Sequence, residues 1–207
     1  MSEWHDAEKV ADYRSRADAI PHRPEGERVL VEVLPASVRR VLDLGCGDGR
    51  LMAIVREARP GAGGLALDFS RPMLEAARKR FGQDSGVEVV EHDLGERLPG
   101  RLGSFDLIVS SFAIHHLEDE RKRDLYREVL ALLEPGGAFC NLEHVASATD
   151  ALHEEFLEAL AIPEDPSNKL VDVETQLRWL RELGFDDADC LWKWRELALL
   201  FGRRGRG

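Results

Sequence analysis

The chain has 207 residues, of which 43% are hydrophobic and 32% charged, a composition typical of one compact globular domain. Its formal net charge of −11 repels polyanions and disfavours nucleic acid as a partner. No apolar run reaches the length of about 18 residues that spans a bilayer. The first residues also lack the basic and apolar regions of a signal peptide. We therefore expect a single cytoplasmic domain over residues 1–207, with no membrane partner.

The three cysteines, Cys46, Cys140 and Cys190, lie far apart and form no C-x-x-C pair. This spacing indicates neither a disulfide framework nor a cysteine zinc site, so we expect reduced thiols and no bound metal. Cys46 stands between two glycines, where a small side chain filling a tight space is the favoured interpretation over a reactive thiol.

Two helices are predicted ahead of the first strand. Residues 5–19 place Val10, Tyr13 and Ala17 at helical spacing, and the prolines at 21 and 24 end this segment before a second helix over residues 25–34.

A strand, a tight turn and a helix follow. Residues 40–44 read as a buried strand, Gly45, Gly47 and Gly49 form the turn, and residues 51–58 are amphipathic. Glycine lacks the Cβ that would block a ligand from the backbone and permits positive φ. The spacing is G-x-G-x-G, whereas dinucleotide-binding turns need G-x-G-x-x-G.

Acids follow the next two predicted strands. Residues 65–70 contain Asp68, which is well placed to accept hydrogen bonds from two ribose hydroxyls. Alternatively, Asp68 caps the helix predicted over 72–81, although Ser70 also suits that cap position, so both roles are compatible. The third strand, residues 87–91, ends just before Asp93.

Histidines follow the fourth and fifth predicted strands. Residues 104–111 lead to His115 and His116, and a helix over 120–133 ends at the sequence P-G-G. The fifth strand, 138–142, then leads to Glu143 and His144. In open parallel sheets the carboxyl ends of the strands form the edge where ligands bind.

The last part of the chain predicts a helix over 147–162, a loop over 163–167, a helix over 173–183 and strands over 188–194 and 197–201. Trp192 and Trp194 share one face of their strand, and we expect them to pack over the last helix rather than line an acceptor pocket. Residues 202–207 are predicted to be a frayed tail. Strands that alternate with helices predict a doubly wound α/β domain with a mostly parallel sheet.

The segment D-L-G-C-G-D-G, residues 43–49, resembles the first motif of the class I S-adenosylmethionine-dependent methyltransferases. Three later segments match this family in order: H-D-L at 92–94, F-D-L-I-V-S-S-x-A-x-H-H-L at 105–117 and L-x-P-G-G at 133–137. The chain is similar to the small-molecule members of types 11 and 12. No G-x-G-x-x-G or Tyr-x-x-x-Lys pattern supports an oxidoreductase.

The resemblance covers residues 38–201 and implies a Rossmann-like cofactor-binding core. It further implies seven strands in the order 3-2-1-4-5-7-6, with the last strand antiparallel. Residues 1–37 would form a helical lid. The implied cofactor is S-adenosyl-L-methionine, with Asp93 and the Leu94 backbone on the adenine. The implied cofactor-binding residues are Tyr13, Asp43, Gly45, Cys46, Gly47, Asp68, Phe69, Asp93, Leu94 and Ser110.

The resemblance also places the acceptor beside the loop after the fourth strand. The candidate catalytic residues are His115, His116 and His144, and neighbouring histidines point to different sides, so at most one of the first two should face the acceptor. Glu143 and His22 are candidate acceptor-binding residues. Histidine suits a base because its ordinary pKa is about 6.5, but a base is needed only if the acceptor must lose a proton.

The function implied is methyl transfer to an oxygen or nitrogen of a small-molecule metabolite, by a monomer or homodimer. Two alternatives stay open: a methyltransferase for RNA or protein, and a protein that binds S-adenosylmethionine without catalysis. The acidic balance of the chain favours the small-molecule acceptor over RNA.

Overall fold

The computed structural model describes residues 20–82, 84–161 and 163–206, and within them a seven-stranded sheet carries helices on both faces. The strands are β1 (Arg40–Leu44), β2 (Gly63–Asp68), β3 (Val87–Glu91), β4 (Phe105–Ser111), β5 (Leu133–His144), β6 (Phe185–Trp194) and β7 (Leu197–Arg204). The helices are α2 (Arg23–Val33), α3 (Arg50–Ala58), α4 (Arg71–Phe81), α5 (Asp119–Leu132), α6 (Asp150–Leu160) and α7 (Val173–Leu183), with a short 3-10 turn η2 (Ile114–His116).

The sheet order is β3-β2-β1-β4-β5-β7-β6, which confirms the predicted topology. The pairs from β3 through to β5 are parallel, while β7 runs antiparallel to both β5 and β6. The carboxyl ends of β1, β2, β4 and β5 therefore meet at one edge. The turn between β6 and β7 lies at the same edge, because Leu197 pairs with His144 at the end of β5.

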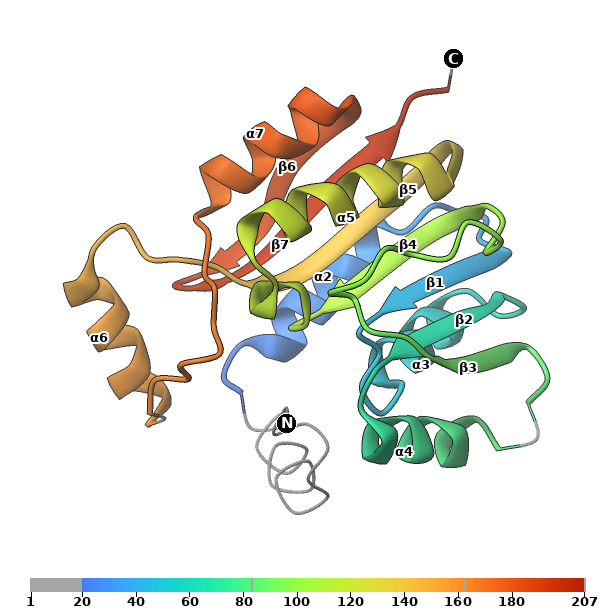
Figure 1. Ribbon diagram of the computed structural model, residues 1–207, viewed down its shortest axis with the longest axis horizontal. Helices are drawn as coiled ribbons and strands as arrows, with labels where there is room; N and C mark the ends of the chain where they lie inside the picture. The colour runs from blue at the N-terminus through green and yellow to red at the C-terminus, as the bar shows by residue number, and fades with distance from the viewer. Residues whose placement is uncertain (1–19, 83, 162, 207) are drawn as a thin grey trace.

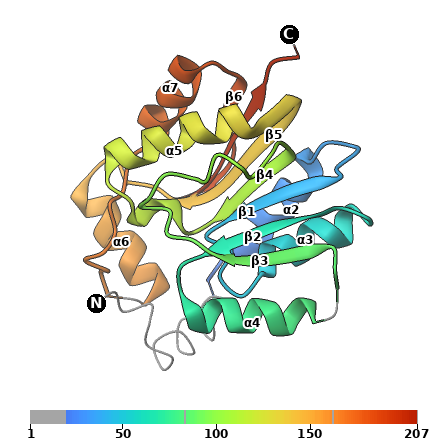
Figure 2. The same cartoon turned by 45° about the vertical axis from the view of Figure 1, so that its right-hand side comes forward.

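Two helical layers cover the sheet (Figures 1 and 2). The helices α2, α3 and α4 bury Leu30, Met52 and Leu74 in one apolar core, on the face that also holds Val41 and Val109. On the other face, α5 and α7 pack into a second core. The helix α6 stands beside the sheet near the carboxyl ends of the strands (Figure 1). Because the helical layers cover the faces of the sheet, the loops that follow the strands form its carboxyl edge.

The structure corrects three predicted boundaries near the end of the chain. The strand β7 extends to Arg204, so the prediction of a frayed tail is wrong for residues 202–204: Gly202 pairs with Phe139 of β5. The strand β6 begins at Phe185, earlier than predicted. The helix α6 occupies Asp150–Leu160 and begins after Thr149, whose hydroxyl accepts a hydrogen bond from the backbone of Leu152.

The helix α2 belongs to the helical layer. Gly26 allows it to approach the sheet closely, because an added Cβ would lie 2.8 Å from the Trp192 ring. Trp192 thus packs against α2, and Trp194 stacks on His22, which directly precedes α2. The prediction that these two side chains cover the last helix is wrong. Only the first turn of α2, at Arg23, reaches the cavity described below. Residues 1–19 of the predicted lid, including Tyr13, lie outside the described residues.

Candidate active site

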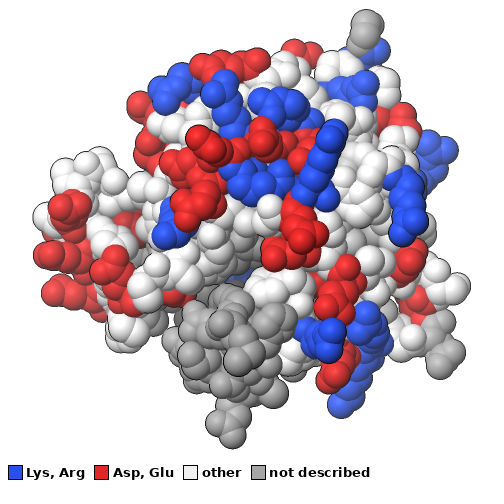
Figure 3. Space-filling model, in the orientation of Figure 1, with Lys and Arg blue, Asp and Glu red and all other residues white. Residues whose placement is uncertain are grey.

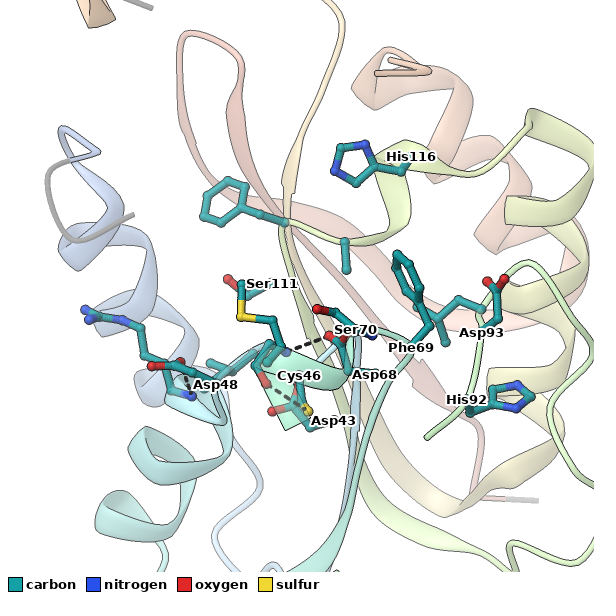
Figure 4. A pocket seen from close by; sticks show the side chains of 18 of the residues that line it. Asp43, Cys46, Asp48, Asp68, Phe69, Ser70, His92, Asp93, Ser111 and His116 are labelled. Carbon is teal, nitrogen blue, oxygen red and sulfur yellow. Dashed lines mark hydrogen bonds between the residues drawn. The ribbon is translucent and has the colours of Figure 1, made fainter. Parts of the chain in front are cut away.

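A cavity of about 610 Å³ opens at the carboxyl edge of β1, β2 and β4. Its walls come from the glycine turn after β1, the end of β2, the segment after β3, the segment after β4, and Ser167 from the loop beyond α6. Figure 4 shows Asp43, Asp48 and Asp68 near the glycine turn, with His116 across the cavity from them. A cavity of this size is in the range of small-molecule sites, about 300–1,000 Å³.

The glycine turn needs glycine for two different reasons. Gly45 has a φ of 66°, and a Cβ there would come within 2.2 Å of the Ala113 Cβ, so the turn packs directly against the segment after β4. Gly47 has a φ of 54°, but its nearest atom would be the Met73 sulfur at 3.9 Å. Gly47 therefore leaves room in the cavity, where a ligand is able to approach the backbone. Both glycines stand where the sequence predicts a ligand contact.

Asp68 connects the ends of β2 and β1. One carboxylate oxygen accepts from the backbone N–H of Gly47 and the other from that of Ser70, both at 2.8 Å. Burial raises the pKa of Asp68, while these backbone bonds oppose the rise. Ser70 occupies the cap position of α4, as predicted, but its side chain makes no capping hydrogen bond. Asp68 thus fixes the turn and faces the cavity.

Asp43 is completely buried beneath the turn. Its Oδ2 accepts from the backbone of Met52, while its Oδ1 has no partner among the described residues. Burial raises the pKa of Asp43 to about 7, and the charges of Asp68 and Asp48 contribute to the rise. Three acids thus surround one glycine turn. Asp48 is paired with Arg80, and two further arginines line the cavity, so both signs of charge face this space.

The far wall beside the acids comes from residues next to β2 and β3. Phe69, His92, Asp93 and Leu94 all line the cavity, with Leu94 buried and Asp93 exposed. Asp93 also accepts a hydrogen bond from the Gly95 backbone, which fixes the local turn. Cys46 lines the cavity too, but burial raises the pKa of its thiol far above the ordinary value, so the chemically inert interpretation fits.

Ser111, which the sequence analysis passed over, lines the cavity in the region where Ser110 was predicted. Successive residues of a strand point to opposite faces. The Ser110 hydroxyl is turned into the sheet, where it donates to the Leu44 carbonyl at 2.8 Å. The buried Ser111 hydroxyl has no partner among the described residues. Strand alternation was the signal that would have identified Ser111.

His116 is the histidine of the predicted catalytic set that lines the cavity. Burial, together with the neighbouring His115, lowers its pKa to about 4, so the imidazole is neutral at pH 7. Its Nδ1 lies 3.1 Å from the Ser167 hydroxyl. Sequence reasoning marked the loop over 163–167 but singled out neither Ser167 nor its partner Asp165, because nothing in the local pattern connects them with His116.

His115 and Glu143 form a buried pair behind the cavity instead of lining it. The His115 Nδ1 lies 2.6 Å from Glu143 Oε1, and the rings of His115 and His116 are 4.0 Å apart. Burial acts to raise the pKa of Glu143, but the contact with His115 and the His144 backbone bond bring the pKa below its ordinary value. The pair supports the ring of His116 from the protein interior.

His144 and His22 also lie away from the cavity lining. The His144 Nε2 is 2.8 Å from Glu196, which also contacts His153 of α6 at 3.0 Å. His22 contacts Glu25 and stacks on Trp194. Within the described part of the chain, no group of three or more His, Cys, Asp or Glu side chains has the arrangement of a metal site.

This fold and edge cavity define a doubly wound α/β protein with a cavity of small-molecule size at the carboxyl ends of its strands. Residues 41–137 match a family model described as a methyltransferase domain. The chain is 35% identical over 153 residues to an uncharacterized methyltransferase, YcgJ, of Bacillus subtilis, covering 70% of this chain and 56% of that protein. It is also 39% identical over 105 residues to a demethylmenaquinone methyltransferase of Clavibacter sepedonicus, covering 51% and 41%.

Among solved structures, an O-methyltransferase family protein of Burkholderia thailandensis superimposes with a TM-score of 0.76 at 24% identity, over 100% of this chain and 64% of that one. This likeness concerns the fold. The methyltransferase domain over residues 41–137 and these relatives support the class I S-adenosylmethionine-dependent methyltransferases as the family of this chain. It spans about half the length of the curated relatives it matches.

The cavity fits the cofactor of this family, S-adenosylmethionine. The open space at Gly47 admits a ligand to the backbone, and the carboxylate of Asp68 would accept hydrogen bonds from the hydroxyl groups of the cofactor. Two buried oxygens that lack partners in the described structure, Asp43 Oδ1 and Ser111 Oγ, belong to residues of the lining. Buried polar atoms are rarely left without a partner, so these two oxygens are hydrogen-bonding groups for which the described residues supply no partner.

Proposed function

We propose that this protein transfers a methyl group from S-adenosylmethionine to an oxygen or nitrogen of a small molecule. The observation that carries the proposal is that one cavity is lined both by the acids of the glycine turn and by His116 across from them. One ligand on the acids and a second ligand beside His116 would then share one space.

Positioning is the main task of such a site. S-adenosylmethionine supplies an electrophilic methyl group on a sulfonium, which is already a good leaving group. Aligning an acceptor with it contributes up to about 7–11 kcal/mol to lowering the barrier. We assign Asp68 to the ribose, Asp93 to the adenine and His116 to the acceptor. Phe112, Ala113 and Leu117 would supply apolar surface beside the acceptor.

Charge and the relatives both support a small acceptor. The net charge is −11, and Figure 3 shows acidic side chains gathered over α6 at the side of the molecule. Such a field disfavours RNA. One relative is named for demethylmenaquinone, which is a small organic molecule. No helix in the described part of the chain is both long and apolar enough to cross a membrane.

The pKa of about 4 favours an orienting role for His116 over that of a strong base. An imidazole of such low basicity accepts a hydrogen bond at pH 7 but holds a full proton poorly. His116→Ala should therefore raise the acceptor KM about tenfold, the equivalent of one hydrogen bond. If His116 instead removes a proton, kcat should fall by about 10²–10⁴-fold.

The direct test is to supply S-adenosylmethionine with a panel of metabolites and to measure S-adenosylhomocysteine by mass spectrometry. Asp68→Ala serves as the inactive control. Turnover on a small molecule with a hydroxyl or amine supports the proposal. Cofactor binding without turnover on any metabolite, RNA or protein extract would favour a non-catalytic binding protein. Tighter binding of NAD than of S-adenosylmethionine would refute the assignment of the site.

A further inference from the structure

The loop beyond α6 reaches back to the cavity and contacts His116. It is attached to the turn η2 by the Lys169 backbone N–H, which donates to the His115 carbonyl at 2.8 Å, and by Lys122, whose ammonium group donates to the Lys169 carbonyl. Lys122 is fully buried. The loop is therefore held at a fixed place against the residues that carry His116.

The hydrogen-bond directions in this loop are fixed by Asp165. Burial acts to raise the pKa of Asp165, but the Ser167 hydroxyl and backbone, together with His116 and His115, bring it below its ordinary value, so the group is a carboxylate at pH 7. A carboxylate only accepts hydrogen bonds. Asp165 Oδ1 accepts from the Ser167 N–H at 2.8 Å and from the Ser167 hydroxyl at 2.7 Å.

The Ser167 hydroxyl has one hydrogen, and Asp165 takes it. Toward the His116 Nδ1, which lies 3.1 Å away, the Ser167 oxygen is left as an acceptor. The Nδ1 must then carry the ring hydrogen. In a neutral imidazole one nitrogen is protonated and the other carries the lone pair.

We propose that Ser167 and Asp165 are positioning residues that hold His116 as the Nδ1–H tautomer, so that its Nε2 accepts a hydrogen bond from the acceptor molecule. This inference rests on the proposed function for its acceptor, and it narrows the acceptor class. The group that faces Nε2 must carry a hydrogen, as a hydroxyl, an amine or an amide N–H does. A thioether or a ring nitrogen without hydrogen would present a lone pair to a lone pair.

The tautomer is measurable without cofactor or acceptor, by two-bond ¹H–¹⁵N NMR of protein labelled with ¹⁵N-histidine, at pH 7. The signals of His116 are assigned by their loss in His116→Gln. We expect the wild-type ring to show a protonated Nδ1 and an unprotonated Nε2. Ser167→Ala removes the acceptor, and Asp165→Ala frees the hydroxyl to donate to Nδ1, so both variants should shift the population toward the Nε2–H form.

Asp172→Ala is the matched control. Asp172 likewise accepts a backbone N–H, from Thr175, but it does not line the cavity, so the His116 signals should be unchanged. Ser167→Thr keeps a hydroxyl and should retain the wild-type tautomer. A wild-type ring in the Nε2–H form, or a tautomer unaffected by Ser167→Ala in a folded protein, would overturn the inference.

Because this readout needs no turnover, its result is independent of whether methyl transfer is observed. Once an acceptor is known, Ser167→Ala should raise its KM about tenfold, as His116→Ala does. The two changes together should cost no more than one alone, since both remove the same hydrogen bond. Additive losses would show that Ser167 acts on the acceptor by itself and not through His116.

Discussion

The two halves of the cavity are built in different ways. In the half proposed for the cofactor, Asp43 lies in β1, Gly47 follows β1 and Asp68 ends β2, and backbone hydrogen bonds hold the two carboxylates. In the acceptor half, His116 takes its place through contacts with a loop about 50 residues away in the chain, at Ser167. The first half follows from local sequence and the second from tertiary packing.

The largest expected effect concerns the contact between the halves at Gly45. Gly45→Ala places a Cβ within 2.2 Å of the Ala113 Cβ at a φ of 66°, so the free energy of unfolding should fall by about 2–5 kcal/mol. Gly61→Ala is the control for φ alone, because its φ is 93° and nothing lies within 4 Å, and it should cost about 1–2 kcal/mol. Urea unfolding measures both.

A partial rescue should accompany that result. Gly45→Ala combined with Ala113→Gly removes the clash and leaves the φ cost, so it should recover to near the Gly61→Ala value. If the double variant is as unstable as Gly45→Ala, the two halves are not in contact at this point.

The second prediction distinguishes the two halves of the cavity by the effect of a substitution in each half on cofactor affinity. Asp68→Ala should weaken the binding of S-adenosylmethionine by about 2–4 kcal/mol, because it removes a buried charged hydrogen-bond acceptor from the cavity. His116→Ala should leave the cofactor affinity within about threefold, since His116 lies across the cavity from the acids. Calorimetry on both variants is the measurement. Equal affinity of Asp68→Ala and the wild type would remove Asp68 from the ribose role.

The third prediction concerns pH. The pKa of Asp43 is raised in the folded state to about 7 from an ordinary value of 3.8, so the folded protein holds a proton that the unfolded chain releases. Its stability should therefore fall as the pH rises from about 4 to about 7 and level off above. Asp43→Asn should abolish this component and stabilise the protein without cofactor by about 1–3 kcal/mol at pH 8.

The same substitution should weaken the binding of the cofactor, because an ionised Asp43 attracts the positive charge of S-adenosylmethionine. Asp124→Asn, an exposed aspartate, is the control and should change neither property. Urea unfolding at pH 5 and pH 8 measures the stability. A variant that keeps the wild-type slope between these values would show that Asp43 is ionised throughout.

The smallest effect is expected at Asp93, the exposed residue of the cofactor half. Asp93→Ala should reduce affinity for S-adenosylhomocysteine by about 0.5–1.5 kcal/mol, because a solvated hydrogen bond contributes little. The inosine analogue lacks the adenine amino group and should bind the wild type and the variant equally. If the variant loses affinity for both ligands alike, Asp93 supports the turn at Gly95 and not the adenine.

The sequence pattern predicted strands that alternate with helices, and the family resemblance implied the strand order that the structure confirms. Strand ends, glycines and acids are local signals, and the glycines and acids predicted at these strand ends line one cavity. Neighbouring residues were the difficulty. Ser110 was chosen where Ser111 lines the cavity, and strand alternation would have separated them. Strand alternation does not separate His115 from His116. Only the burial of Glu143, which pairs with His115, and the position of Ser167, which contacts His116, decide which ring lines the cavity.

The antiparallel course of β7 affects the order in which parts of the sheet fold during synthesis. The strands β1 to β4 all lie within residues 40–111 and pair with one another, so this part of the sheet is able to assemble before β5, β6 and β7 have been made. The strand β7 enters between β5 and β6, and the turn before it brings Glu196 to His144 and His153. In a nascent chain, the glycine turn and the end of β2 should therefore fold first. The contacts of Glu196 with His144 and with His153 of α6 should form only after β7, which ends at residue 204, has emerged.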